Sequence, residues 1–182
     1  MSNLLLKLAK IAEGEIGHEE APRGSNRGAA LAAYFKADNY EPGGGRDEGY
    51  PWCASFVSFC VQQFLRTKVG IANFSHVTAP RLAAAFAFEG WGDKQGALIF
   101  SPREARFGTE KWPQPGDIVT FGFSHVGIVF AASQEGARIF TAVEGNSNKD
   151  GSREGYAVVK HGRTFSQVRE FIRLTPKAEA LS

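Results

Sequence analysis

The sequence predicts a single α+β domain, with helices in the first half of the chain and an antiparallel β-sheet in the second. A chain of 182 residues suits one domain and can bury a core without disulfides or a structural metal. Apolar residues recur at a helical period up to about residue 88, whereas β-branched and aromatic runs dominate after residue 117. We assign residues 1–175 to the domain and residues 176–182 to a frayed polar tail.

Four helices are expected in the first half. The first ends near Gly17, and Ser25 or Asn26 is a candidate cap of the second. The third begins at Cys53, directly after a Gly-rich loop, and apolar residues cover most of its surface, so we expect it to be buried. In the fourth, Pro80 stands in the first turn, where proline is favoured. The expected helices cover residues 4–15, 29–36, 53–65 and 78–88.

Five strands are expected in the second half. Each candidate run is rich in β-branched and aromatic residues, and Gly, Ser, Asn or Asp separates it from the next run. Helices followed by such a succession of strands are typical of the α+β class, in which the helices cover one face of an antiparallel sheet. The expected strands cover residues 117–121, 125–132, 138–143, 156–160 and 168–174.

Composition and charge argue against two classes of partner. A net charge of +2 without basic runs gives no support to nucleic-acid binding. No stretch approaches ~18 apolar residues, so no membrane span is expected.

The apolar run at residues 4–6 is too short for a secretory signal, and Lys7 interrupts it. We therefore expect a protein made in the cytoplasm without a signal peptide.

The two cysteines have different expected roles. In a continuous helix Cys53 and Cys60 would lie about 10.5 Å apart along the axis, which is too far for a disulfide. Cys60 falls on the apolar face of the helix and reads as a core residue. Cys53 stands at the start of the helix, where free N–H groups and positive partial charge stabilise a thiolate. Cys53 is therefore a candidate nucleophile, although a buried structural cysteine remains the alternative.

A nucleophilic cysteine needs a base, which is normally a histidine. His18, His76 and His161 stand in charged or turn-rich segments and are expected at the surface. His125 instead begins an apolar strand, so its ring can face a cleft while the sheet fixes its position. His125 is therefore the candidate base.

The base in turn needs a group that accepts from its second ring nitrogen. Glu144 and Asn146 follow an apolar strand, and regular strand alternation would put both on one face. If that strand neighbours the strand of His125, Glu144 can meet the imidazole. A polar hairpin turn is the alternative interpretation of this segment.

Taken together, four short motifs in this order resemble the CHAP domain, the cysteine- and histidine-dependent amidohydrolases/peptidases of the papain-like hydrolases, which include the NlpC-type wall peptidases. They are PWCASFVS at residues 51–58, PGDIV at 115–119, SHVGIV at 124–129 and VEGN at 143–146. The upstream GSNRG at residues 24–28 also resembles phage lysins that carry a CHAP domain. The resemblance implies a papain-like fold, with Cys53 as nucleophile, His125 as base, and Glu144 and Asn146 as the residues that orient His125.

The resemblance also implies a substrate, which is bacterial peptidoglycan. The bond would be the N-acetylmuramoyl–L-alanine amide or a peptide bond of the stem or cross-bridge. Some CHAP lysins bind calcium in an Asp-rich loop before the nucleophile, but this loop offers only Asp47 and Glu48, and calcium takes six to eight oxygens. We expect no metal and no cofactor.

Two biological settings fit a wall hydrolase that lacks an export signal. One is a phage endolysin released through holin pores, and the other is an antibacterial effector delivered by a secretion system, with an immunity protein as a further partner. Either would act on the wall in the periplasm, and we expect a monomer. The alternative from another class is a non-catalytic module that binds wall fragments or a protein on the same fold.

Overall fold

The structure is a computed structural model that describes residues 3–38, 49–133, 137–151 and 154–177. The described residues form helices followed by an antiparallel sheet, which confirms the predicted α+β class. The helices are α1 (Leu6–Gly14), α2 (Ala29–Asp38), α3 (Cys53–Leu65), α4 (Lys68–Phe74) and α5 (Ala87–Lys94), and a short 3-10 helix spans Phe165–Gln167. The strands are β1 (Leu98–Phe100), β2 (Ile118–Phe121), β3 (His125–Ala132), β4 (Ile139–Ser147), β5 (Ala157–Thr164) and β6 (Val168–Arg173).

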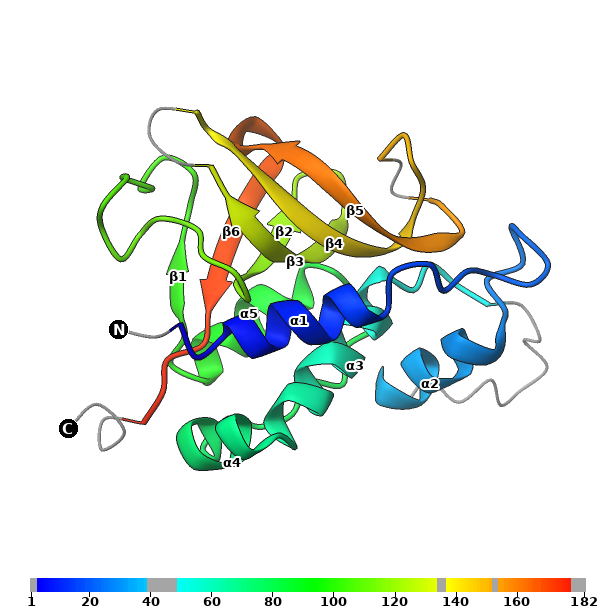
Figure 1. Cartoon of the computed structure of the whole chain (residues 1–182), viewed down its shortest axis with the longest axis horizontal. Helices are drawn as coiled ribbons and strands as arrows, with labels where there is room; N and C mark the ends of the chain where they lie inside the picture. The colour runs from blue at the N-terminus through cyan, green and yellow to red at the C-terminus, as the bar shows by residue number, and fades with distance from the viewer. Residues whose placement is uncertain (1–2, 39–48, 134–136, 152–153, 178–182) are drawn as a thin grey trace.

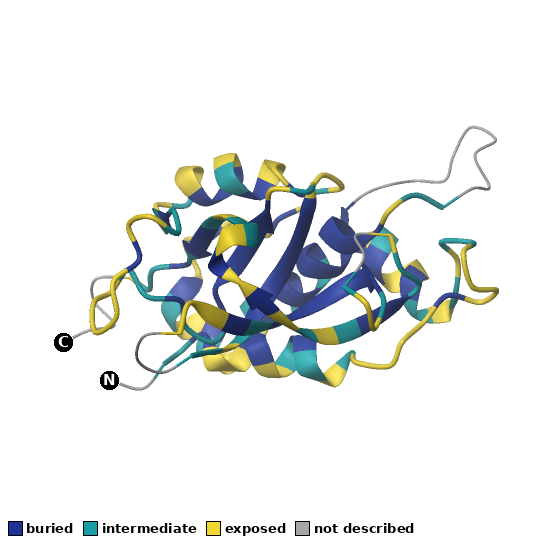
Figure 2. Ribbon diagram, turned by 90° about the horizontal axis from the view of Figure 1, so that it is seen from above, coloured by how far each residue is buried: buried dark blue, intermediate teal, exposed yellow. Residues whose placement is uncertain are grey.

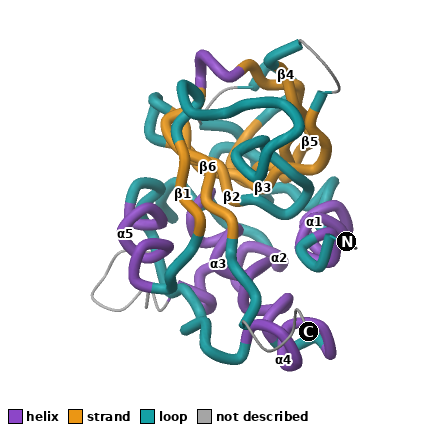
Figure 3. Tube along the Cα trace, turned by 90° about the vertical axis from the view of Figure 1, so that its left-hand side faces the viewer, coloured by secondary structure: helices purple, strands orange, loops and turns teal. Residues whose placement is uncertain are grey.

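The six strands form one sheet in the order β1-β6-β2-β3-β4-β5, and every neighbouring pair is antiparallel. The helices gather on one side of this sheet, as Figures 1 and 3 show from two directions. The central strands are buried (Figure 2), because apolar side chains pack on both of their faces. Val126 and Ile128 join the cluster formed with the helices, whereas Val129 joins a Phe-rich cluster that includes Phe121 and Phe140.

Helix α3 is the central helix of the domain. It packs against α1, α2, β3 and β4, and ten of its thirteen residues are buried. Apolar residues around most of its circumference explain this position, as expected from the sequence. Its N-terminus is thereby brought to the strands β3 and β4.

The predicted helix over residues 78–88 is wrong, because the chain is irregular up to Phe86 and α5 begins only at Ala87. Side chains from elsewhere bind the backbone groups that such a helix would need. The Pro80 carbonyl accepts from Gln62 (2.7 Å), and Ser58 bonds both the N–H and the carbonyl of Leu82. These long-range hydrogen bonds replace the local ones of a helix.

Smaller differences concern the ends of elements and short elements. The second helix begins at Ala29, directly after Gly28, so neither Ser25 nor Asn26 is its cap residue. Helix α4 and strand β1 were not expected, and both are short. The five predicted strands are present, although β4 and β5 each extend four residues further than expected.

Two further expectations were a single domain with a frayed tail and the absence of a membrane span. The single-domain assignment of residues 1–175 stays a prediction, and most of the tail over 176–182 lies outside the described residues. Within the described ranges, no helix is long and apolar enough to cross a bilayer.

Candidate active site

Cys53 is the first residue of α3 and is 5% exposed. The first hydrogen bond of the helix runs from the Phe56 N–H to the Trp52 carbonyl (3.0 Å), so the N–H groups of residues 53–55 have no acceptor within the helix. Within the described chain no side chain caps this end, and its first turn contains no acidic residue. The positive end of the helix dipole, with amides that have no acceptor within the helix, therefore adjoins the thiol.

Two side chains fix the segment that leads into Cys53. Trp52 is fully buried, stacks on Tyr34 and donates its indole N–H to Glu20 (3.0 Å). Asp38, at the end of α2, accepts hydrogen bonds from Tyr50 (2.6 Å) and from Ser55 in the first turn of α3. These contacts hold the start of α3 against the rest of the domain.

His125 is the first residue of β3 and is fully buried. It pairs with Phe121 across a tight turn in which Ser124 has a φ of 61°. The rings of Phe121 and Phe123 lie against the imidazole, each with a centroid separation of 5.9 Å. The turn and the two aromatic rings therefore limit the orientations of the histidine ring.

Glu144 comes from β4, which neighbours β3, so the condition for Glu144 to meet His125 holds, and Glu144 is fully buried. Its Oε2 lies 3.0 Å from Nε2 of His125. Among the described residues neither ring nitrogen has an aligned hydrogen bond, a common state of catalytic hydrogen bonds before substrate binds. Because Nε2 faces Glu144, Nδ1 is the nitrogen that remains for Cys53.

Two glycines allow the strands to come this close. A Cβ at Gly127 would lie 2.8 Å from Cγ of Glu144, and a Cβ at Gly145 would lie 2.7 Å from side-chain atoms of Trp52 and Phe56. Either contact is too short for a real side chain. Glycine at these positions therefore brings β3, β4 and α3 together around His125.

Asn146 is buried, but the expected alternation does not extend to it. Glu144 pairs with Val159 and Ser147 pairs with Ala157, so β4 contains an extra residue between these pairs. Asn146 itself has a φ of 54°. This bulge breaks the period on which the shared face of Glu144 and Asn146 was based, and the orienting role of Asn146 stays a prediction.

The pKa of His125 is raised to about 9. Burial favours the neutral ring and lowers the pKa, but the neighbouring Cys53 and Glu144 side chains stabilise the charged ring and more than compensate. The pKa of Glu144 is lowered: burial opposes its ionisation, whereas Arg163 and His125 favour it. The site thus favours a charged imidazolium beside the Glu144 carboxylate.

Arg163, on β5, is a site residue that the sequence interpretation missed. Its Nε and one terminal nitrogen donate to the two oxygens of Glu144, at 2.7 and 2.5 Å. The predicted strand ended at residue 160, so no expectation covered this position. A lone arginine in a strand carries no local signal, because its partner is nineteen residues away in the chain.

The comparisons with known proteins bear on this site. Residues 45–146, more than half of the chain, match the model of the CHAP domain. The chain belongs to the CHAP domain family. This confirms the resemblance and implies a hydrolase of the peptidoglycan hydrolase or amidase type. The searches of curated proteins and of solved structures give no match.

The matched range contains Cys53, His125, Glu144 and Asn146 and ends before Arg163. In this CHAP domain the other three histidines have different surroundings. The His18 ring lies 3.0 Å from Glu15, the His161 ring contacts the Asn148 carbonyl, and His76 is exposed beyond α4. The structure therefore brings only His125, of the four histidines in the described chain, to Cys53.

The second cysteine differs from the first. Cys60 is fully buried, and burial raises its pKa well above the ordinary value, with a smaller contribution from Glu15. Both cysteines lie in the described part of the chain and are free. A buried neutral thiol is the expected state of Cys60 at neutral pH.

The described residues contain no group of three or more His, Cys, Asp or Glu side chains arranged to hold a metal ion. Asp47 and Glu48, on which the expectation of no calcium was based, lie outside the described residues. That expectation therefore stays a prediction.

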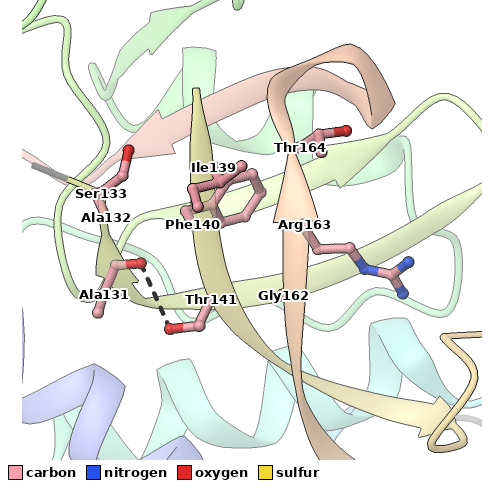
Figure 4. Close-up of a pocket in the computed structure, with 9 residues that line it drawn as sticks. All are labelled: Ala131, Ala132, Ser133, Ile139, Phe140, Thr141, Gly162, Arg163 and Thr164. Atoms are coloured by element: carbon pink, nitrogen blue, oxygen red, sulfur yellow. Dashed lines mark hydrogen bonds between the residues drawn. The ribbon is translucent and has the colours of Figure 1, made fainter. Parts of the chain in front are cut away.

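A separate hollow of about 330 Å³ lies over β3, β4 and β5 (Figure 4). Its lining is mostly apolar and includes Ala131, Ile139 and Phe140. Neither Cys53 nor His125 lines it. Arg163 does, but its guanidinium points away from Ile139 and Phe140 (Figure 4). The hollow offers no nucleophile with a base, so it is not the candidate active site.

Proposed function

We propose that this CHAP domain hydrolyses an amide bond of peptidoglycan, with Cys53 as nucleophile, His125 as general base and acid, and Glu144 as the residue that orients His125. The observation that carries the proposal is the position of the His125 ring, which has Glu144 at Nε2 and Cys53 as its other partner. A nucleophile, a base and an orienting carboxylate in this order form the arrangement of thiol hydrolases.

The first half of the reaction forms a thioester. The Cys53 sulfur attacks the amide carbonyl carbon, and the carbonyl oxygen becomes an oxyanion. The N–H of Cys53, which has no acceptor in α3, donates to that oxyanion. The C–N bond then breaks as the imidazolium of His125 gives its proton to the leaving amine. The products of this half are a free amine and an acyl group on Cys53.

The second half releases the acid. Neutral His125 takes a proton from a water molecule, whose oxygen attacks the thioester carbonyl. The C–S bond breaks, the carboxylic acid leaves, and the site returns to the thiolate–imidazolium pair. Glu144 keeps the ring in one orientation through both proton transfers, because Nε2 faces its carboxylate.

The bond is either the N-acetylmuramoyl–L-alanine amide or a peptide bond of the stem or cross-bridge. The two products differ chemically. An amidase frees the amino group of L-alanine and leaves the lactyl carboxylate of muramic acid. A peptidase leaves L-alanine attached and creates a new amino group further along the peptide.

Mass spectrometry of digested sacculi tests the proposal. Purified wild-type protein should release soluble fragments with one of these two sets of ends, and Cys53→Ala should release none. An intact wall after incubation with folded wild type would contradict the proposal. Reaction with iodoacetamide near neutral pH then distinguishes an enzyme from a non-catalytic binding module, since only an activated Cys53 is alkylated rapidly.

We propose that the protein acts on the wall in the periplasm, because its proposed substrate lies there. The two proposed settings are a phage endolysin released through holin pores and a secreted antibacterial effector with an immunity protein. Expression with an added secretory signal should lyse a Gram-negative host, and Cys53→Ala should suppress that lysis. Equal toxicity of the two exported forms would point to binding or misfolding instead.

A further inference from the structure

Arg163 is a buried cation beside the proposed catalytic residues, and within the described chain its hydrogen bonds go to Glu144 and Gly151. It is 5% exposed. Besides its two bonds to Glu144, it donates to the Gly151 carbonyl at 3.1 Å. These three hydrogen bonds, from Nε and one terminal nitrogen, pair the buried charge and offset part of the cost of burying it. The side chain therefore has one defined position in the folded protein.

The same two aromatic rings contact both Arg163 and His125. The guanidinium carbon lies 5.2 Å from the ring centroid of Phe121 and 5.3 Å from that of Phe123. The His125 ring lies 5.9 Å from each of these rings. The arginine and the histidine are thus held by one aromatic pair as well as by one carboxylate.

The geometry of the carboxylate follows from the two bonds of the guanidinium. Arginine presents two parallel N–H groups in a plane, so a bidentate pair fixes both the position and the plane of the partner carboxylate. Oε2 of Glu144 lies 2.5 Å from the arginine nitrogen and 3.0 Å from Nε2 of His125. The oxygen that faces the histidine is therefore one of the two that Arg163 holds.

We propose that Arg163 is a positioning residue for the amide hydrolysis, whose bidentate grip on Glu144 fixes the carboxylate oxygen that orients His125 toward Cys53. This inference rests on the proposed function of Cys53, His125 and Glu144. It concerns a residue beyond the range that matches the CHAP domain. Arg163 itself touches no reacting atom and acts through Glu144.

A pH dependence follows from the charged groups around the carboxylate. Arg163 from β5 and His125 from β3 act on Glu144, and Cys53 from α3 and Glu144 from β4 act on His125. Burial alone would raise the pKa of Glu144, and Arg163 opposes it through a hydrogen bond and its charge. Without Arg163 the carboxyl group takes up a proton at a higher pH. The acid limb of the activity should then move to higher pH.

Three variants separate positioning from a structural role. Arg163→Met removes both the charge and the fork, which is the pair of hydrogen bonds that the guanidinium donates to the two oxygens of Glu144. Arg163→Lys keeps a charge but cannot form the planar bidentate pair. Arg173→Met is the matched control, because Arg173 forms the same fork with Asp117 (2.7 and 2.6 Å) and bonds neither His125 nor Glu144. Release of wall fragments and alkylation of Cys53 by iodoacetamide are measured against pH, with thermal unfolding as the check of folding.

Arg163→Met should lower kcat about 100-fold, the cost of a small misplacement of a catalytic group, with little change in KM. Its acid limb should move up by about one pH unit, for wall cleavage and for alkylation. Arg163→Lys should keep the acid limb of the wild type and lose about tenfold in kcat. Arg173→Met should unfold at a lower temperature and keep both pH profiles.

A folded Arg163→Met protein with the kcat and acid limb of the wild type overturns the inference. If that variant does not fold, Arg163→Lys decides, and an unchanged kcat in it shows that the planar fork is not needed. A wild type that leaves sacculi intact contradicts the proposed function instead. The alkylation profiles then still test whether Arg163 positions the Cys53–His125 pair.

Discussion

Two arginine–carboxylate forks bind elements of the same sheet, but the pKa values of the two carboxyl groups are shifted in opposite directions. Arg163 holds Glu144 and Arg173 holds Asp117, each through two hydrogen bonds of 2.5–2.7 Å. The pKa of Glu144 is lowered and that of Asp117 is raised, although burial opposes ionisation in both. At Asp117 the burial outweighs Arg173 and a backbone N–H, whereas at Glu144 a second cation, His125, adds to the arginine.

The third partner of each carboxylate accounts for the difference in role. Asp117 accepts from the backbone N–H of Gln114 (2.8 Å), and Arg173 also binds the carbonyls of Glu110 and Trp112, so this fork ties a long loop to the sheet. Glu144 faces His125 instead. The Arg173–Asp117 pair is therefore structural, because the third partner of its carboxylate is a backbone N–H. The Arg163–Glu144 pair belongs to the proposed proton-transfer site, because the third partner of its carboxylate is a titratable histidine.

The largest expected effect comes from removing Cys53 or His125, the two proposed catalytic residues that the Arg163–Glu144 pair supports. Cys53→Ala and His125→Ala should each reduce wall hydrolysis by at least about 10⁴-fold, and the double variant should be no worse, because the two residues act as one unit. Cys53→Ala should cost only about 1 kcal/mol of unfolding free energy, on the scale of one buried methyl group. Fragment release and thermal unfolding are the measurements. Full activity in Cys53→Ala would eliminate the thiol mechanism.

Glu144→Gln should have the next largest effect, about 10²-fold, because an amide still accepts from the ring but carries no charge. In the wild type the alkaline limb of kcat/KM should lie near pH 9, where His125 loses its proton. Removing the negative charge of Glu144 favours the neutral ring, so the limb should move to lower pH. A pH profile of fragment release measures this shift. An alkaline limb that stays near pH 9 in Glu144→Gln would show that the charge of Glu144 does not raise the pKa of His125. The Glu144 and Asp117 pairs would then no longer differ in role.

Asp117→Asn should affect stability without affecting catalysis. It leaves Arg173 without its counter-charge, and breaking a buried pair in this way costs about 3 kcal/mol. Denaturant unfolding should show this loss, while the pH profile of wall hydrolysis should match the wild type. A shifted profile would show that the Asp117 fork also reaches the active site.

Cys60→Ser should give the smallest change. A hydroxyl in the apolar face of α3 should cost about 1–3 kcal/mol, and turnover should stay close to normal. Mass spectrometry after brief treatment with iodoacetamide near neutral pH should find the label on Cys53 alone, because burial raises the pKa of Cys60. Labelling of Cys60 in the folded protein would contradict its assignment to the core.

Patterns of apolar residues along the sequence predicted the elements whose structure depends on neighbouring residues. The apolar surface of α3 and the β-branched runs of β2 to β6 identified most of the fold. The sequence named Glu144 as a partner of His125 only if their strands were neighbours, and the structure supplies that pairing. The irregular segment before α5 was missed, because Gln62 and Ser58 reach it from α3. Arg163 was missed for a related reason: its role depends on the pairing of β4 with β5 and on rings from β2 and the following turn, and none of these adjoin it in sequence.

The absence of side chains at Gly127 and Gly145 has a consequence for experiments that score many variants at once. In a saturation library selected for wall lysis, both positions should reject alanine as strictly as Cys53 rejects it, because a single added carbon would meet Glu144, or Trp52 and Phe56, at 2.7–2.8 Å. An activity score alone would then rank two glycines among the catalytic residues. Scoring the same library for abundance as well would separate them, since a displaced strand lowers the amount of folded protein much more than a missing sulfur does.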